Sequence, residues 1–550
     1  MFRSMSSDRA RWLLLAIAAL VLVGHSLAYN FVTDDAYISF VYSRNLAEHG
    51  ELSFNLGQPV EGYTSFLWTV IIGCGMLAKI PPEWSSRVLA TVCAVLTLLV
   101  VFRLVERALG RKTPWATIPP LLLAASAGFA CWTSGGLETQ LFTLLVVVAV
   151  DGVVDAVQRP GAIRRVGIAL ALAAMTRPEG LLVAGVLGIV HLTSVGQKWQ
   201  AYGRFSSIRD ELFAIGFFLV LWTPWFAWRY WYYGHLWPNT YYVKAAGRWI
   251  DPQFGLEMYR LGAHYLWVWL NQTKLLFAVP FALLGMIVGG SRTPRFVLAM
   301  ACMLLAAAYL PYVVTVGGDF MGLHRFIMPM FVVAAISVTL GLEFLASLGT
   351  HPRSGNEART LHVGPARLGT ILAALLVGGF AWTQLQLTRE SLRFGNFAND
   401  RGIDTPAFLI VYTEDRAAIG KAMAPCFTPD DFSIVGGAGA QPYYGRMRGI
   451  DVFGLVSDRI AHEEPRIRAR AGHTKFGSDP LLASYDPTFV FSCYQIHGTP
   501  TQPRLGCASF WLARGYEQVT MRIPGMRQQG EYYTFLAKKA RKFECPGRVQ

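Results

Sequence analysis

The feature that most constrains this chain is a long series of apolar runs separated by short basic links. Hydrophobic residues make up 53% of the chain and charged residues only 15%, whereas soluble domains contain about 25% charged residues. An apolar run of about 20 residues is long enough to cross a bilayer as a helix. The sequence therefore predicts a polytopic α-helical membrane protein, and its composition excludes disordered, collagen-like and disulfide-scaffold classes.

The basic residues indicate how the expected spans are oriented. The formal net charge is +14, and much of it lies in short links, where positive charge marks the cytoplasmic side. These links include residues 103–112, 159–165, 198–209, 292–295 and 351–367. We expect about eleven spans, with the N-terminus in the cytoplasm and the C-terminal part outside it. Nucleic-acid binding is disfavoured, and a cleaved signal peptide is the alternative for the first run.

Two apolar segments do not fit a simple crossing. Residues 66–80 are followed by Pro81 and Pro82, and a full crossing there would invert the later basic links, so we expect a re-entrant element at the outer face. The runs 164–176 and 179–195 meet at a break that carries Arg177. Charges at such a break should face a polar cavity.

The chain divides by composition into two expected domains. Residues 1–388 should form the transmembrane catalytic domain, with 30–65 as its first periplasmic loop. Residues 389–550 are richer in charge and should form a soluble extracytoplasmic α/β or α+β domain. Short β-rich runs alternate there with Gly/Pro turns, at 408–411, 432–435 and 488–491. Four cysteines in this domain suggest one or two disulfides with open pairing: Cys426, Cys493, Cys507 and Cys545.

The first outer loop contains an acidic pair at the start of a predicted helix. Apolar residues at helical spacing predict an amphipathic helix over 34–48 along the membrane interface, with Thr33 as its N-cap and Gly50 ending it. Asp34 and Asp35 occupy the first turn. They could simply favour the helix dipole. Alternatively, one of them is a general base whose pKa is raised by partial desolvation and by its neighbour.

Several motifs resemble those of GT-C glycosyltransferases, in particular the mycobacterial terminal arabinofuranosyltransferases. The resemblance begins with DDAYISFVYSRNLAEHG at 34–50 and covers most of the chain. Further matching segments are GLETQLF at 136–142, TRPEGLL at 176–182, WPNTYYVKA at 237–245, GGDFMGLHRFIMP at 317–329, VGGAGAQPYYGRMRGIDVFGLVSDRIA at 435–461 and GHTKFGSDP at 472–480.

The resemblance implies a multi-pass GT-C fold in a bacterial inner membrane and an enzyme of cell-envelope biogenesis. Its donor would be a polyprenyl-phosphate-linked sugar, most simply arabinofuranose, and its acceptor a glycan, glycolipid or protein at the outer face. The matching acids are Asp34 and Asp35, with Asp34 as the expected base. A hexose or aminosugar transferase of the same superfamily is the alternative. Outside the enzymes, a lipid-linked-sugar transporter or flippase is the main rival, followed by a scaffold or receptor.

The chemistry of transfer from a lipid phosphate suggests where cations are needed. Charge gathers on the departing phosphate, which calls for cationic donors. We expect Arg177, Lys244, His324 and Arg325 to bind the donor phosphate. An ion pair with Glu179 is the alternative for Arg177, and snorkelling toward headgroups is the alternative for Lys244.

Polar and aromatic residues near the same outer mouth are candidates for sugar or acceptor contact. These are Glu61, Tyr63, Trp68, Glu138, Asp319 and His473. Their structural alternatives are an aromatic belt for the rings, turn or helix-end roles for the acids, and surface solvation for His473. No ligand set with metal-binding spacing is visible in the sequence, although outer acids leave room for Ca²⁺ or Mg²⁺.

Overall fold

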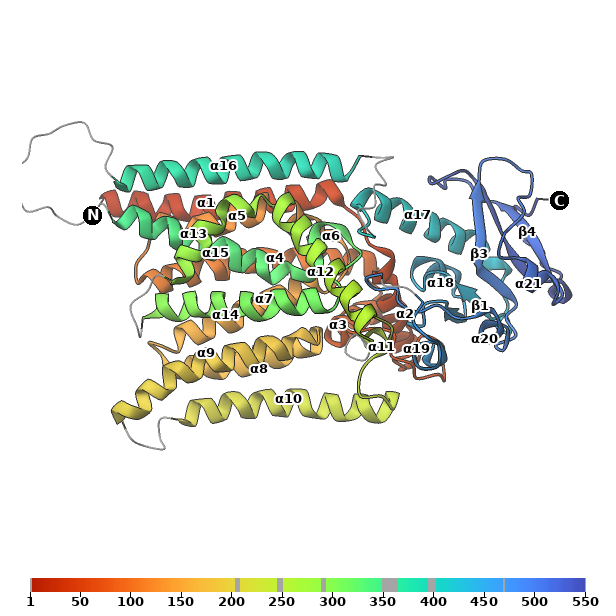
Figure 1. Cartoon of the computed structure of the whole chain (residues 1–550), viewed down its shortest axis with the longest axis horizontal. Coiled ribbons are helices and arrows are strands. Elements are labelled where there is room, and N and C mark those ends of the chain that lie inside the picture. The colour runs from red at the N-terminus through yellow and green to blue at the C-terminus, as the bar shows by residue number, and fades with distance from the viewer. Residues whose placement is uncertain are drawn as a thin grey trace, which may run out of the picture.

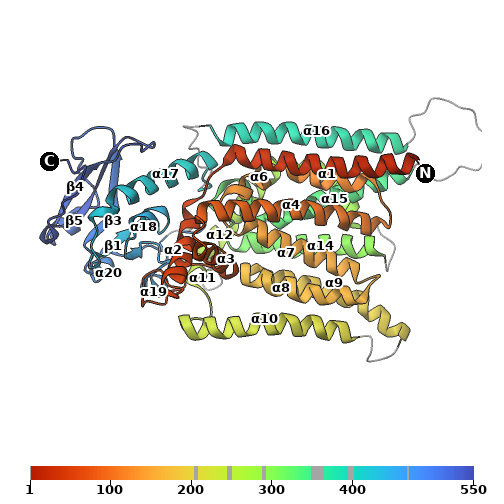
Figure 2. The same ribbon diagram turned by 180° about the vertical axis from the view of Figure 1, so that it is seen from behind.

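A computed structural model of the chain describes residues 2–202, 208–244, 251–287, 293–348, 365–393, 402–467 and 470–549. Figure 1 shows a bundle of long helices with a smaller, sheet-containing domain at one end, and the two termini lie at opposite ends of the molecule. Helices α1 and α16 run along one edge of the bundle and α10 along the other, as the reverse view confirms (Figure 2).

The long helices are roughly parallel to the long axis of the molecule (Figure 1). The helical elements before the C-terminal domain are α1 (Phe2–Tyr29), α2 (Asp34–His49), α3 (Phe66–Leu77), α4 (Pro82–Leu109), η1 (Pro114–Thr117), α5 (Ile118–Ala125), α6 (Ala127–Ser134), α7 (Thr139–Asp155), η2 (Pro160–Ala162), α8 (Ile163–Thr176), α9 (Glu179–Tyr202), α10 (Arg209–Tyr233), α11 (Asn239–Lys244), α12 (Pro252–Gln272), α13 (Leu275–Ile287), α14 (Pro294–Thr315), η4 (Gly322–Ile327), α15 (Met328–Ser347) and α16 (Pro365–Ser391).

Within the described residues, six helices are long and apolar enough to cross a membrane, or eight if each of two bent pairs counts as one span. The bent pairs are α5 with α6, at 63°, and α12 with α13, at 94°. The expected count of about eleven spans is therefore not confirmed. Helix α3 has 12 residues, too few for a crossing of about 20, as expected for 66–80.

The break between α8 and α9 lies where the sequence predicts it. Helix α8 ends at Thr176 and α9 begins at Glu179. Pro178 lacks a backbone donor and disfavours a helical conformation for the residue before it. Arg177 accordingly adopts an extended conformation with φ −151° and ψ 141°.

The C-terminal domain contains a five-stranded mixed sheet in the order β2-β1-β3-β5-β4. Strand β1 pairs in parallel with β2 and β3, and β5 pairs antiparallel with β3 and β4. The expected α/β or α+β class is confirmed. Its elements are α17 (Pro406–Met423), η5 (Ala424–Cys426), β1 (Ser433–Val435), α18 (Ala440–Gly445), β2 (Gly449–Asp451), α19 (Asp458–Glu463), α20 (Asp479–Ala483), β3 (Phe489–His497), α21 (Ser509–Leu512), β4 (Tyr516–Arg522), β5 (Tyr532–Lys538) and η6 (Lys539–Arg541).

One of the three predicted β-rich runs is wrong. Residues 432–435 contain strand β1, and residues 488–491 contain the first residues of strand β3. Residues 408–411 instead lie in the first turns of α17, whose N-cap Thr405 accepts a hydrogen bond from the backbone N–H of Phe408. A four-residue apolar run fits one face of a helix as well as a strand, so periodicity alone cannot separate the two.

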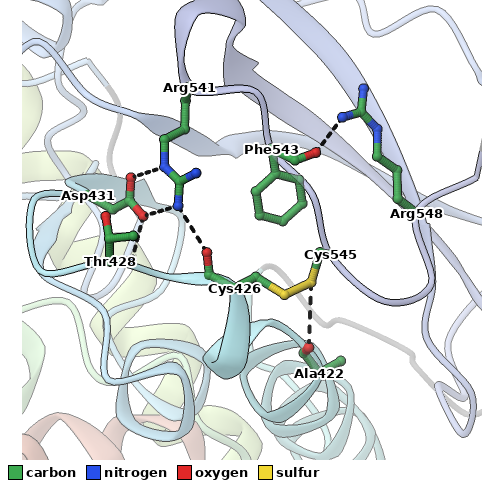
Figure 3. The surroundings of a disulfide bond; sticks show 8 residues. All are labelled: Ala422, Cys426, Thr428, Asp431, Arg541, Phe543, Cys545 and Arg548. Carbon is green, nitrogen blue, oxygen red and sulfur yellow. Dashed lines mark hydrogen bonds and ion pairs between the residues drawn. A yellow bond between two sulfur atoms is a disulfide. The ribbon is translucent and has the colours of Figure 1, made fainter.

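Two disulfides close the domain, Cys426–Cys545 and Cys493–Cys507. Figure 3 shows the first of them beside an ion pair between Arg541 and Asp431, whose Nε–Oδ1 distance is 2.9 Å. Arg541 also donates to the carbonyl oxygen of Cys426, at 3.1 Å. The disulfide and the ion pair therefore connect the end of α17 to the last residues of the described chain.

Removing the longer-range disulfide should destabilise the domain more than removing the shorter one. Cys426→Ser with Cys545→Ser opens a sequence separation of 119 residues, whereas Cys493→Ser with Cys507→Ser opens one of 14. Loop-closure entropy grows with loop length, so the first pair should cost about 2–5 kcal/mol and the second less. Thermal unfolding of the full chain under non-oxidising conditions measures both. The reverse order would contradict the prediction.

Candidate active site

A polar cavity of about 350 Å³ lies where the helical bundle meets the C-terminal domain. Segments far apart in the sequence form its wall, including α2, the loop before α3, the α8–α9 break, α11 and the 316–326 segment. The charged lining residues are Asp35, Glu138, Arg177, Glu179, Lys244, Asp319 and Arg325, and the aromatic ones are Tyr63, Trp237, Tyr241, Tyr312 and Phe326. Leu455 and Gly472 of the C-terminal domain complete it.

Arg325 projects into the cavity from a turn with an uncommon backbone. The two residues before it, Leu323 and His324, have φ values of 56° and 62°. Non-glycine residues in this left-handed region are strained and are often found at functional sites. Arg325 Nε lies 2.6 Å from Asp319 Oδ2, and its Nη2 lies 3.7 Å from Asp35 Oδ2.

The pair with Arg325 keeps Asp319 ionised. Burial by itself would raise the pKa of Asp319, but the adjacent Arg325 guanidinium outweighs burial and holds the pKa below its ordinary value. Asp319 also accepts a hydrogen bond from the backbone N–H of Phe320, at 2.9 Å. The Asp319 carboxylate thus holds the Arg325 guanidinium in position at the cavity wall.

Arg177 forms a second buried charge cluster on the cavity wall. Its Nη1 lies 3.5 Å from Glu138 Oε1 and its Nε 3.4 Å from Glu179 Oε2. The guanidinium also lies over the Phe326 ring, at 5.1 Å from the ring centre. The ion pair with Glu179, the predicted alternative for Arg177, is therefore present. Arg177 also lines the cavity, and its binding of the donor phosphate stays a prediction.

Lys244 differs from the two arginines because no carboxylate lies within ion-pair distance of it in the part of the chain that the structure describes. It is the last residue of α11 and is half-buried. A lysine ammonium has three N–H donors and no acceptor. Its charge contributes to the lowered pKa of Asp319 across the cavity.

Helix α2 packs between the bundle and the C-terminal domain. All of its residues from Ala36 to Ser43 are buried, so this part of the helix is covered by protein on every side. Its expected position along the membrane interface stays a prediction. The hydroxyl of Tyr37 lies 3.2 Å from that of Tyr444, and Arg44 donates to the carbonyl oxygen of Tyr443 at 2.7 Å. Gly50 ends the helix with φ 75°, as expected, but the Thr33 side chain makes no capping hydrogen bond.

The two acids of α2 point to different places. Asp35 lines the cavity. Asp34 does not, and its Oδ1 accepts a hydrogen bond from the backbone N–H of Ala440 at 2.8 Å. A Cβ added at Gly439 would lie 2.1 Å from the Asp34 carbonyl oxygen, so the glycine-rich loop packs directly on this residue. Asp35 is therefore the member of the pair that lines the cavity, whereas Asp34, the expected base, contacts the glycine-rich loop.

Asp34 has a perturbed ionisation. Burial against the glycine-rich loop raises its pKa from 3.8 to about 6, the Ala440 N–H opposes this shift, and the charge of Asp35 adds to it. The predicted rise in pKa therefore occurs at Asp34, the acid that contacts the C-terminal domain.

Two of the predicted site residues, Glu61 and Trp68, have structural partners away from the cavity. Glu61 forms a buried bidentate ion pair with Arg229, with distances of 2.8 and 2.6 Å. Trp68 is fully buried and donates to the Gly136 carbonyl oxygen at 3.1 Å. Each partner comes from a distant part of the chain, which explains why sequence spacing placed these residues at the mouth of the site.

His324 and His473 also lie outside the cavity lining. The Nε2 of His324 lies 2.9 Å from Gln272 Oε1. His473 packs edge-on against Phe320 and Phe453, at 4.8 and 4.5 Å between ring centres. His473 is therefore part of the contact between the two domains, and the solvated surface position offered as its alternative is wrong.

Tyr312 and Leu455 line the cavity although no sequence pattern predicted them there. Tyr312 lies in the apolar helix α14 and donates to Glu179 Oε1 at 3.2 Å. An aromatic residue inside an apolar run carries no signal that separates it from the core. Leu455 belongs to the matching motif at 435–461, but only the packing of the two domains brings it to the cavity.

The chain is similar to known proteins in sequence and in structure, although no family model matches it. The terminal β-(1→2)-arabinofuranosyltransferase of Corynebacterium glutamicum is 25% identical over 348 residues, which cover 55% of this chain and 47% of that protein. The chain therefore spans about half the length of this curated relative.

The solved structure of apo ArnT from Cupriavidus metallidurans is similar over 98% of this chain and 99% of ArnT, with a TM-score of 0.57 and 13% sequence identity. The chain has the GT-C fold. In sequence it resembles an arabinofuranosyltransferase of that superfamily. A second ArnT structure, bound to undecaprenyl phosphate, covers 80% of this chain and 85% of ArnT with a TM-score of 0.49 and 14% identity.

The position of Asp34 predicts how stability depends on pH. The folded chain holds the Asp34 proton more tightly than the unfolded chain, because the folded pKa is about 6 and the ordinary value 3.8. This stabilisation is complete below the ordinary pKa and is lost as pH rises through about 6. Asp34→Asn keeps the acceptor oxygen and cannot ionise.

Melting temperatures of the purified full chain between pH 4 and 7 test this. The wild type should lose stability relative to Asp34→Asn as pH rises, by at most about 3 kcal/mol. Glu48→Gln is the matched control, because Glu48 is a more exposed acid on the same helix, paired with Arg446 at 3.0 Å. Parallel profiles for the wild type and Asp34→Asn would contradict the prediction.

Proposed function

We propose that the chain is a membrane glycosyltransferase that moves a sugar from a polyprenyl-phosphate donor to a hydroxyl of a cell-envelope acceptor. The observation that carries the proposal is that Asp35 lines the same cavity as the cations Arg325 and Lys244. Transfer from a lipid phosphate needs a base for the acceptor and positive charge for the leaving group. The cavity also borders the apolar helices α9 and α14, through Leu182 and Tyr312, which supports a donor carried on a lipid.

The transfer step assigns each group a role. The acceptor hydroxyl gives its proton to the Asp35 carboxylate, and its oxygen forms the new bond to the anomeric carbon. The bond between that carbon and the phosphate oxygen breaks, and its electron pair leaves with the polyprenyl phosphate. Lys244 and Arg325 stabilise the charge that develops on the phosphate. Asp319 holds Arg325 in position for this.

Arabinofuranose is the sugar we propose first, with a glycan, glycolipid or protein as the acceptor. The support is the resemblance to the Corynebacterium arabinofuranosyltransferase, which extends over 348 residues. Tyr63, Tyr241 and Tyr312 would line the sugar, since all three residues line the cavity. The cavity would open toward the outer side of a bacterial inner membrane, so that the lipid tail stays in the bilayer.

The contrast between Asp35→Asn and Asp34→Asn tests the proposed base. Asp35→Asn should lower turnover about 10²–10⁴-fold, the usual contribution of a general base. Asp34→Asn should keep most of the activity, because Asp34 faces the glycine-rich loop. The measurement is release of polyprenyl phosphate from a polyprenyl-phosphoryl arabinofuranose donor with an arabinan acceptor. Equal loss in both variants, or loss only in Asp34→Asn, would sink the assignment.

Replacement of Lys244 should weaken donor binding. Lys244→Gln removes one charge-assisted contact, typically about 1.5–3 kcal/mol, so we expect KM for the donor to rise about tenfold or more. Lys244→Arg should retain more of the binding than Lys244→Gln. Lys274→Gln is the control, because Lys274 lines a separate, mostly apolar cavity of about 430 Å³. An unchanged KM in Lys244→Gln would show that the phosphate binds elsewhere.

A further inference from the structure

A second cluster of chemically active side chains lies beside the cavity and outside the site described above. His235, Asp458 and His462 each offer one ligand atom, and these atoms lie within 4.8 Å of one another. His235 follows α10, whereas Asp458 and His462 belong to α19 of the C-terminal domain. Figure 1 shows α19 next to α11, where the two domains meet.

The three side chains converge from two fixed backbones. Asp458 and His462 are four residues apart on α19, so they share one face of that helix. The imidazole of His235 stacks on that of His462, with ring centres 4.3 Å apart and an interplanar angle of 21°. Arg229 holds the His235 backbone by donating to the carbonyl oxygens of His235 and Leu236, at 3.4 and 3.0 Å.

The cluster lacks the internal hydrogen bonds that would explain it as a structural network. His235 Nε2 and Asp458 Oδ2 are 3.9 Å apart, beyond hydrogen-bond distance. Asp458 Oδ1 is shielded from solvent and has no hydrogen-bond partner in the described part of the chain.

We propose that His235, Asp458 and His462 bind a divalent transition-metal ion, with Zn²⁺ as the best fit. Two imidazoles and a carboxylate match the ligands of Zn²⁺, which leaves a fourth position for water. Ca²⁺ and Mg²⁺ prefer oxygen ligands and fit poorly. Zinc–ligand bonds of about 2.0–2.2 Å require the three side chains to close slightly from their present separations, which rotation of the exposed His462 allows.

The metal would connect the two domains at the cavity wall. The segment after His235 contributes Trp237, Tyr241 and Lys244 to the cavity. Helix α19 follows closely after Leu455, whose carbonyl oxygen accepts from Asn239 Nδ2 at 3.4 Å. A bound ion would fix these segments relative to each other. The site does not depend on the proposed glycosyltransferase activity, so each can fail separately.

Metal content of the purified full chain tests the site. The chain is purified in detergent with a tag that contains no histidine, stripped with EDTA, incubated with ZnCl₂ and freed of unbound metal. Elemental analysis should find about one Zn²⁺ per chain, and an added chelator should lower the melting temperature. CaCl₂ and MgCl₂ should not raise it in the stripped protein.

Variants assign the zinc to the cluster. His462→Ala and Asp458→Asn should each weaken Zn²⁺ binding at least tenfold in a competition titration with a chelating dye. His49→Gln, a change of an exposed histidine on α2, should bind like the wild type. If His462→Ala does not fold, the zinc stoichiometry of the wild type and the absorption spectrum of its Co²⁺ complex still test whether the cluster binds a metal ion. Wild-type protein without bound zinc, or ligand variants that bind as tightly as the wild type, would overturn the proposal.

Discussion

The site depends on one buried ion pair, between Arg325 and Asp319. A guanidinium taken out of water is costly unless a carboxylate and hydrogen bonds compensate it, and Asp319 provides this at 2.6 Å. The left-handed backbone at Leu323 and His324 presents Arg325 to the cavity. Nη2 of the same guanidinium lies 3.7 Å from Oδ2 of Asp35, which comes from the first loop. Acid and cation thus meet from segments almost 300 residues apart.

The C-terminal domain is part of the site because helix α2 packs between this domain and the helical bundle. Asp34 accepts from Ala440 in the glycine-rich loop, while its neighbour Asp35 faces the cavity. Adjacent residues on a helix point about 100° apart, so one acidic pair serves two purposes. Asp34 joins the domains, and that contact holds Asp35 in place. We infer that the domain positions the first loop as well as closing the cavity.

Local signals in the sequence predicted several elements well, namely the helix over 34–48 with its end at Gly50, the break at Arg177–Pro178, and strands β1 and β3. These depend on capping, proline and short-range patterning. The orientation of Asp34 and Asp35 could not be predicted, because it depends on where the glycine-rich loop packs. Glu61 was misplaced for the same reason, since its partner Arg229 is 168 residues away. The GT-C fold was predicted from motif resemblance. The hydropathy count of about eleven spans is not confirmed, since six to eight spans within the described residues are long and apolar enough.

The central claim is that the cavity between the domains receives the phosphate of a lipid-linked donor. Cryo-electron microscopy of the full chain with added polyprenyl phosphate tests this most directly. The phosphate should lie between Lys244 and Arg325, within charge-assisted hydrogen-bond distance of both, with its lipid chain leading toward the bilayer-facing helices. A phosphate bound elsewhere, with this cavity empty at saturating ligand, would contradict the claim.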